Sequence, residues 1–255
     1  MQVIRFVAIL LTSLITFCSA KGVERIVGGF EVSIEQAPYQ VALLYYGFLR
    51  CGGSIISRKF VLTAAHCVHY VPASYLSIRA GSAEHASGGT EHKVGRVDIH
   101  PKYDNSLLDY DAAILTLQQN IQFDTLKKPI RLPFLNQALP TGTYVTTSGW
   151  GLTGDGVLAS SVLRMVELRV TDQVECYKIY QEDGGITTRM VCAGAISKDS
   201  CDGDSGGPLV DIRTKKLVGI VSFGLDRGKC AIDGVPGVYT RVASIRPWIR
   251  QIVRF

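Results

Sequence analysis

Residues 203–208 read Gly-Asp-Ser-Gly-Gly-Pro, which places Ser205 among glycines. Glycine allows tight turns and the close approach of a bound molecule to the backbone, so this string suits an accessible nucleophile. The same residue types are also the commonest ones in ordinary turns. The string by itself leaves both interpretations open, and the rest of the chain has to decide between them.

Two upstream segments supply the groups that a nucleophilic serine needs. Residues 62–67 read Leu-Thr-Ala-Ala-His-Cys, which sets His66 at the end of an apolar run as a candidate general base. Residues 109–115 read Asp-Tyr-Asp-Ala-Ala-Ile-Leu, and Asp111 could orient the imidazole from the start of a buried-looking strand. The chain order His66, Asp111, Ser205 is one of three known for this geometry. The three segments together predict nucleophilic catalysis.

Short β-type segments bounded by turn residues make up most of the chain. The pattern predicts strands over 39–46, 53–56, 60–64, 75–80, 94–99, 112–117, 144–149, 162–170, 217–223 and 237–242. Many short strands with little helical periodicity predict an all-β barrel or sandwich. Two prolines interrupt the pattern within 124–133, where we expect a division into two halves. The C-terminal tail instead predicts an amphipathic helix, with an apolar face made of Ile245, Trp248, Ile249 and Ile252.

The first 25 residues have the pattern of a leader and a short propeptide. Residues 1–20 carry Arg5, then an apolar run and then small residues, which predicts a signal peptide and a secreted, extracellular product. The alternative, a membrane anchor, is disfavoured because polar residues break the run, namely Thr12, Ser13 and Thr16. Residues 21–25 end in Arg25 before the apolar Ile26. We therefore expect a removable propeptide over 21–25 and one domain over 26–255.

Composition and charge exclude several other classes of protein. Charged residues are 19% and hydrophobic residues 47% of the chain, as in an ordinary globular protein. The formal net charge is +5, and removal of residues 1–25 leaves 24 basic against 21 acidic residues. Because the basic residues are scattered singly, we expect no nucleic acid partner. The histidines outside the catalytic candidates show no zinc-ligand spacing, and we expect neither a metal nor a cofactor.

Cysteine usage fits an exported protein. Of the seven cysteines, Cys18 lies within the predicted signal peptide. The other six form an even set, which predicts three disulfides without fixing their pairing: Cys51, Cys67, Cys176, Cys192, Cys201 and Cys230.

From Ile26 to Phe255 the chain resembles the trypsin and chymotrypsin family of serine proteases. The resemblance rests on the segment around Asp111 and on strings at 26–29, 63–67, 148–151, 190–194, 199–208 and 236–239. It implies a fold of two six-stranded antiparallel β-barrels packed side by side, with the catalytic site in the crevice between them. His66 and Asp111 would come from the first barrel and Ser205 from the second.

The resemblance also implies roles for other residues. The backbone N–H groups of Gly203 and Ser205 would form the oxyanion hole. Cleavage between Arg25 and Ile26 would activate the precursor, because the new ammonium would insert beside Asp204. The disulfides would join Cys51 to Cys67, Cys176 to Cys192, and Cys201 to Cys230.

The implied substrate pocket selects Arg or Lys before the cut bond. Asp199 would lie at its bottom, and a carboxylate in a deep, open slot favours a long cation. Its lining and walls would include Ser200, Ser222, Gly224 and Gly237. We expect polypeptide substrates, protein protease inhibitors as partners, and a monomer. The alternatives are an Asp199 that is only a solvated loop carboxylate, a protease preferring large apolar side chains, and a catalytically inactive binding module.

Three departures from the family pattern stand out in the sequence. Phe223 stands where most relatives have Trp, and Asp202 occupies a rim position that usually carries an uncharged amide. Ser82 replaces a Glu ligand of calcium-binding relatives, although Glu84 and Glu91 remain. Because Ca²⁺ prefers several oxygen ligands including carboxylates, we expect no calcium site in the loop over 81–91.

Overall fold

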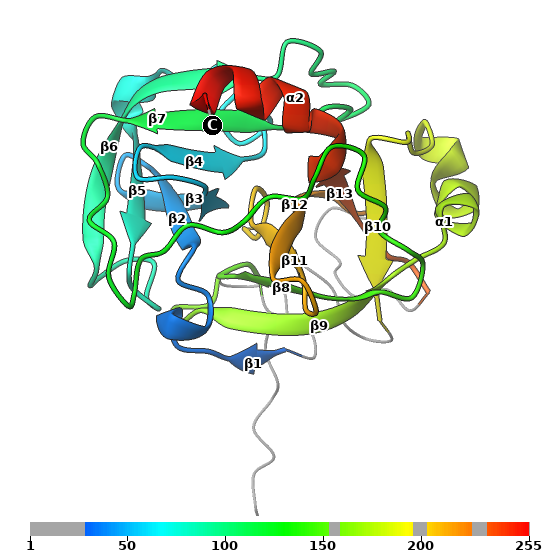
Figure 1. Ribbon diagram of the computed structural model, residues 1–255, viewed down its shortest axis with the longest axis horizontal. Coiled ribbons are helices and arrows are strands. Elements are labelled where there is room, and N and C mark those ends of the chain that lie inside the picture. The colour runs from blue at the N-terminus through cyan, green and yellow to red at the C-terminus, as the bar shows by residue number, and fades with distance from the viewer. Residues whose placement is uncertain (1–28, 153–158, 196–202, 226–233, 255) are drawn as a thin grey trace, which may run out of the picture.

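Figure 1 shows a computed structural model in which two bodies of β-strands lie side by side. The structure describes residues 29–152, 159–195, 203–225 and 234–254. Most of its regular structure consists of strands, joined by turns and a few short 3₁₀ segments, with two α-helices.

The first body is a closed barrel of six antiparallel strands in the order β2-β3-β4-β7-β6-β5. Its strands are β2 (Gln40–Tyr45), β3 (Phe48–Ile55), β4 (Phe60–Thr63), β5 (Leu76–Ala80), β6 (Thr90–Ile99) and β7 (Ala113–Leu117). Apolar side chains fill it, and those of Val41, Leu62, Ile78 and Ile114 are fully buried. Closure leaves no open sheet edge, so the backbone polar groups of these strands find partners within the barrel.

The second body forms a ring of the same size. Its strands follow the order β9-β10-β13-β12-β11-β8, and pairing of β8 with β9 closes the ring. They are β8 (Tyr144–Gly149), β9 (Arg164–Val170), β10 (Met190–Gly194), β11 (Pro208–Asp211), β12 (Lys216–Phe223) and β13 (Gly237–Arg241). The two-residue strand β1 (Phe30–Glu31) adds to β9 from outside the ring. The prediction of two six-stranded antiparallel barrels is therefore confirmed.

The predicted C-terminal helix is present as α2 (Val242–Val253). Three of its predicted apolar residues are buried, namely Ile245, Trp248 and Ile249. They pack into the same apolar cluster as the first barrel, although α2 follows the last strand of the second. The helix thus spans the two barrels, as the red ribbon at the top of Figure 1 shows.

The sequence pattern missed three strands and one α-helix. Strands β1, β10 and β11 are short or rich in small residues, which gives little periodicity to detect. Helix α1 (Gln173–Tyr180) buries only Cys176 and Tyr180, so it lacks an apolar stripe. Its one strong signal is the N-cap Asp172, whose side chain accepts hydrogen bonds from Val174 N and Glu175 N. Among the described residues, no helix is long and apolar enough to cross a membrane.

Candidate active site

His66 and Asp111 meet at one end of the first barrel. His66 follows β4 by three residues and Asp111 precedes β7 by two, and these strands are neighbours with Thr63 paired to Ala113. The Nδ1 atom of His66 lies 2.7 Å from Oδ2 of Asp111, and the backbone N–H of His66 donates to Oδ1 at 2.9 Å. Both carboxylate oxygens therefore bind the same residue, which fixes the orientation of the imidazole.

The two side chains differ in their access to solvent. The carboxylate of Asp111 is fully buried, whereas the His66 side chain is 25% exposed. Burial of an ionised carboxylate is costly unless hydrogen bonds compensate it. Here Ser222 Oγ from β12 also donates to Oδ2 at 2.6 Å, and Thr240 Oγ1 from β13 donates to the Asp111 carbonyl at 2.8 Å. The second barrel therefore helps to hold an acidic residue of the first.

Ser205 lies on a tight loop that precedes β11. The backbone N–H of Gly52 donates to the Ser205 carbonyl at 2.8 Å, and Gly206 N donates to Val221 O at the same distance. Gly206 has φ +77°, and a Cβ there would lie 2.2 Å from Thr63 Oγ1 and 3.1 Å from Ala64 N. The loop of the second barrel thus presses against the segment that leads to His66, with Ser205 partly exposed.

Several glycines around Ser205 and Asp204 are required for steric reasons. Gly203 has φ +97°, which L side chains rarely adopt, and a Cβ there would approach Cα of Gly151 to 3.0 Å. Asp204 is buried, and its Oδ1 accepts a hydrogen bond from Gly151 N at 2.8 Å. A side chain at Gly149 or Gly151 would collide with this carboxylate. The segment Gly149–Gly151 therefore packs closely around the Asp204 side chain.

The substrate-pocket residues lie partly within the described chain. Gly237 opens β13, opposite Ala193 of β10. Gly224 follows β12, and a Cβ there would meet no atom within 4 Å, so the space around it is open. Ser222 directs its hydroxyl to Asp111, as described above. The other residues singled out in the sequence lie outside the described residues: Arg25, Ile26, Asp199, Ser200, Cys201, Asp202 and Cys230.

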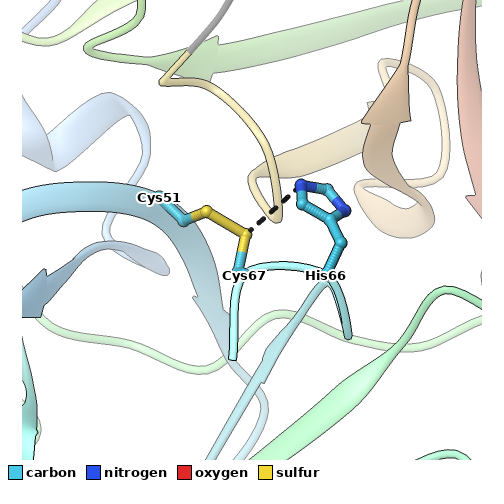
Figure 2. Close-up of side chains that lie close together, drawn as sticks. All are labelled: Cys51, His66 and Cys67. Carbon is cyan, nitrogen blue, oxygen red and sulfur yellow. Dashed lines mark hydrogen bonds between the residues drawn. A yellow bond between two sulfur atoms is a disulfide. The ribbon is translucent and has the colours of Figure 1, made fainter. Parts of the chain in front are cut away.

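Two of the three disulfides are seen. Cys51 is bonded to Cys67 and Cys176 to Cys192, which confirms these pairings. Figure 2 shows the first bond beside the imidazole, with Cys67 Sγ 3.7 Å from Nε2 of His66. These three side chains bring ligand-type atoms within 4.8 Å of one another. Because both sulfurs are held in the disulfide, they are not thiolate ligands, and the cluster pins the His66 loop instead.

The loop over 81–91 does not fit a calcium ion. Calcium would need carbonyl and carboxylate oxygens from this loop. The Arg79 guanidinium already donates to the carbonyls of His85 at 3.1 Å and Gly88 at 2.8 Å. It also pairs with Glu91 at 3.4 Å. The loop is therefore organised around a resident side-chain cation.

The sequence is similar to known proteins along most of its length. The family described as Trypsin matches residues 26–249. Trypsin 5G1 of Aedes aegypti is 47% identical over 231 residues, which cover 89% of this chain and 85% of the mosquito protein. The vitellin-degrading protease of Bombyx mori is 40% identical, with coverages of 89% and 85%. Trypsin iota of Drosophila melanogaster is 38% identical, with coverages of 88% and 87%.

Proposed function

We propose that this chain, which belongs to the trypsin family of serine endopeptidases, cleaves polypeptides after Arg or Lys with Ser205 as its nucleophile. The observation that carries the proposal is the hydrogen bonding around Asp111, whose two oxygens bind the backbone N–H and Nδ1 of His66. This leaves Nε2 of His66 as the atom that exchanges a proton with the nucleophile.

The reaction would proceed in two halves. In the first, Ser205 Oγ attacks the substrate carbonyl and passes its proton to His66 Nε2, and Asp111 stabilises the resulting imidazolium. The proton then moves to the leaving amine as the peptide bond breaks, which leaves an acyl-enzyme on Ser205. In the second half, water attacks the acyl-enzyme with His66 again as the base. Backbone N–H groups of Gly203 and Ser205 would stabilise the oxyanion by about 3–4 kcal/mol each.

The preference for Arg and Lys rests on Asp199. Its place in the sequence, six residues before Ser205, is the one expected for the carboxylate at the bottom of the pocket. The open space around Gly224 supports a slot that admits a long side chain. Ser200 and Gly237 would complete the lining, together with the backbone of Ser222.

Activation would follow removal of residues 1–25. The new ammonium of Ile26 would bind Asp204, a buried carboxylate whose loop carries both oxyanion donors. Arg164 Nη2 donates to Gly29 O at 2.7 Å, so the fourth residue after this cut is already held against β9. We also propose that the protein is secreted, joins Cys201 to Cys230, acts as a monomer and is restrained by protein inhibitors.

Matched reporter peptides test the proposal. The protein cleaved after Arg25 should hydrolyse a peptide with Arg before the reporter group and leave the corresponding Phe peptide almost untouched. Ser205→Ala, secreted and folded to the same extent, should show no turnover above background. A preference for Phe would overturn the specificity, and full activity of Ser205→Ala would overturn the nucleophile.

A second arm tests activation. An Arg25→Gln protein, shown by mass spectrometry to be uncut, should be nearly inactive because the ammonium that binds Asp204 never forms. If this uncut protein hydrolyses the Arg peptide as fast as the processed enzyme, activation at this bond is wrong.

A further inference from the structure

Asp109 stands two residues before Asp111 and binds the opposite barrel. Its side chain is 11% exposed. Oδ1 accepts hydrogen bonds from Thr187 Oγ1 at 3.0 Å and Arg189 Nε at 3.3 Å, and Oδ2 accepts from Arg189 Nη2. Thr187 and Arg189 lie just before β10, so this ion pair joins the segment that carries Asp111 to the second barrel.

The backbone on both sides of Asp109 is strained. Tyr110 has φ +53° and Leu108 has φ +51°, which non-glycine residues seldom adopt. The N–H of Ala112 donates to the Tyr110 carbonyl at 2.7 Å, which closes a tight turn with Asp111 at its centre. Such conformations persist only when surrounding contacts impose them. The direction of the Asp111 side chain therefore depends on what fixes the residues on either side.

Arg189 holds the two residues that precede Asp111 in this turn through two contacts. Besides its ion pair with Asp109, its guanidinium carbon lies 5.1 Å from the centre of the Tyr110 ring. The His100 ring also stacks on Tyr110, with 4.5 Å between the ring centres. Asp109 Oδ1 also accepts from the Tyr110 backbone N–H at 2.9 Å. One carboxylate thus holds both the backbone of the strained residue and the guanidinium that covers its ring.

Arg189 is itself anchored close to the residues that bind Asp111. Its carbonyl accepts a 2.7 Å hydrogen bond from Arg241 N, next in sequence to Thr240, whose hydroxyl binds the Asp111 carbonyl. The contacts of Asp109 and of Asp111 with the second barrel therefore lead to the same end of β13. A shift of one would be passed to the other.

We infer that Asp109 and Arg189 are positioning residues that set the place of Asp111 relative to His66. The inference rests on the proposed function, since it assigns them an effect on the proton transfer by His66. Loss of the ion pair would let the turn relax and would weaken the Nδ1 hydrogen bond of His66, while the substrate pocket would keep its shape. A displacement of about 1 Å in a catalytic group can cost about 100-fold in rate.

The test compares Asp109→Asn, Arg189→Gln and Arg189→Lys with the wild type, all activated and with active sites titrated. The first two should lower kcat on the Arg peptide by about 10- to 100-fold with KM nearly unchanged. Arg189→Lys should fall between, because an ammonium keeps the charge but not the paired donors. The downfield proton resonance of the hydrogen bond between His66 and Asp111 should shift in step with kcat.

Arg96→Gln is the matched control, because it breaks a surface ion pair with Asp98 on β6. It should leave kcat and the resonance unchanged. The inference is overturned if the Asp109 and Arg189 variants keep wild-type kcat, if only KM changes, or if kcat falls while the resonance stays in place. Failure of the proposed function looks different, since the activated wild type would then not hydrolyse the Arg peptide at all.

Discussion

The hydroxyl of Ser222 donates a 2.6 Å hydrogen bond to Oδ2 of Asp111, the same oxygen that binds His66. The two residues are 111 positions apart and belong to different barrels. The buried carboxylate is thus satisfied from both halves of the molecule, and its environment exists only when the barrels are packed together.

Replacing Ser222 with Ala should therefore affect both stability and catalysis. The fully buried carboxylate of Asp111 would lose one of its hydrogen-bond donors. Loss of a hydrogen bond to a charged group typically costs about 1.5–3 kcal/mol of stability. We expect denaturant unfolding to show a loss of that order and kcat to fall severalfold with little change in KM. Ser160→Ala, which removes a hydroxyl donor to Val162 O outside the site, is the control. A larger effect of Ser222→Ala on KM than on kcat would point to substrate contact instead.

Replacing Gly206 with Ala should displace the Ser205 loop. The new Cβ would collide with Thr63 Oγ1 at 2.2 Å and Gly52 O at 2.7 Å, and the residue would also keep a positive φ. We expect a loss of about 100-fold or more in kcat/KM, measured on active protein. Gly142→Ala is the matched control, because Gly142 also has a positive φ, +79°, but an added Cβ there would meet no atom within 4 Å. It should cost only about 1–2 kcal/mol in stability and leave activity intact.

Replacing Asp199 with Ser should remove the preference for basic residues. At about 4 Å and an effective dielectric constant near 20, a carboxylate and a cation attract by about 4 kcal/mol. We expect kcat/KM for the Arg peptide to fall by about two to four orders of magnitude, and the Phe peptide to gain little because the slot keeps its shape. Asp202→Gln, a change at the expected rim, should alter Arg cleavage only modestly. An unchanged ratio of Arg to Phe cleavage in Asp199→Ser would refute the pocket assignment.

Removal of divalent cations should not destabilise the protein. The carbonyls of His85 and Gly88 are bound by Arg79, so the loop over 81–91 needs no added cation. Thermal unfolding should give the same Tm in calcium and in EDTA. Arg79→Met should lower Tm in both media alike, because the loop loses its resident cation. A Tm that rises with calcium in the wild type would show that the loop binds the ion after all.

The buried His100 should make stability fall on mild acidification. Burial, with a smaller effect of nearby Lys102, lowers its pKa to about 4, while Asp109 opposes the shift. Between about pH 6.5 and pH 4 the unfolded chain therefore binds a proton that the folded chain does not, and the free energy of unfolding decreases as pH falls. Chemical denaturation across this range should show a shallower decrease in His100→Phe. Equal slopes in the two proteins would contradict this prediction.

Strong local patterns accounted for most of the fold. Alternating segments such as Arg164–Val170 and the three- and four-residue spacing in Val242–Val253 predicted their elements, because each pattern buries one face. Strand β11 and helix α1 were missed for the opposite reason. Their sequences carry little apolar periodicity, and the neighbouring strands and the Asp172 cap decide their conformation.

The sequence by itself determined the candidate chemistry. It places a histidine beside a cysteine, an aspartate before an apolar strand and a serine in a glycine-rich string, and their order along the chain is one known for catalytic triads. Only the tertiary structure decided how these groups are held. It gave Asp111 its donors Ser222 and Thr240, seated Asp204 against Gly149 and Gly151, and tied Asp109 to Arg189. Each of these contacts joins segments 53 or more residues apart. No local pattern records such pairs, because they form only when closure of each barrel and packing between the two bring distant backbone together.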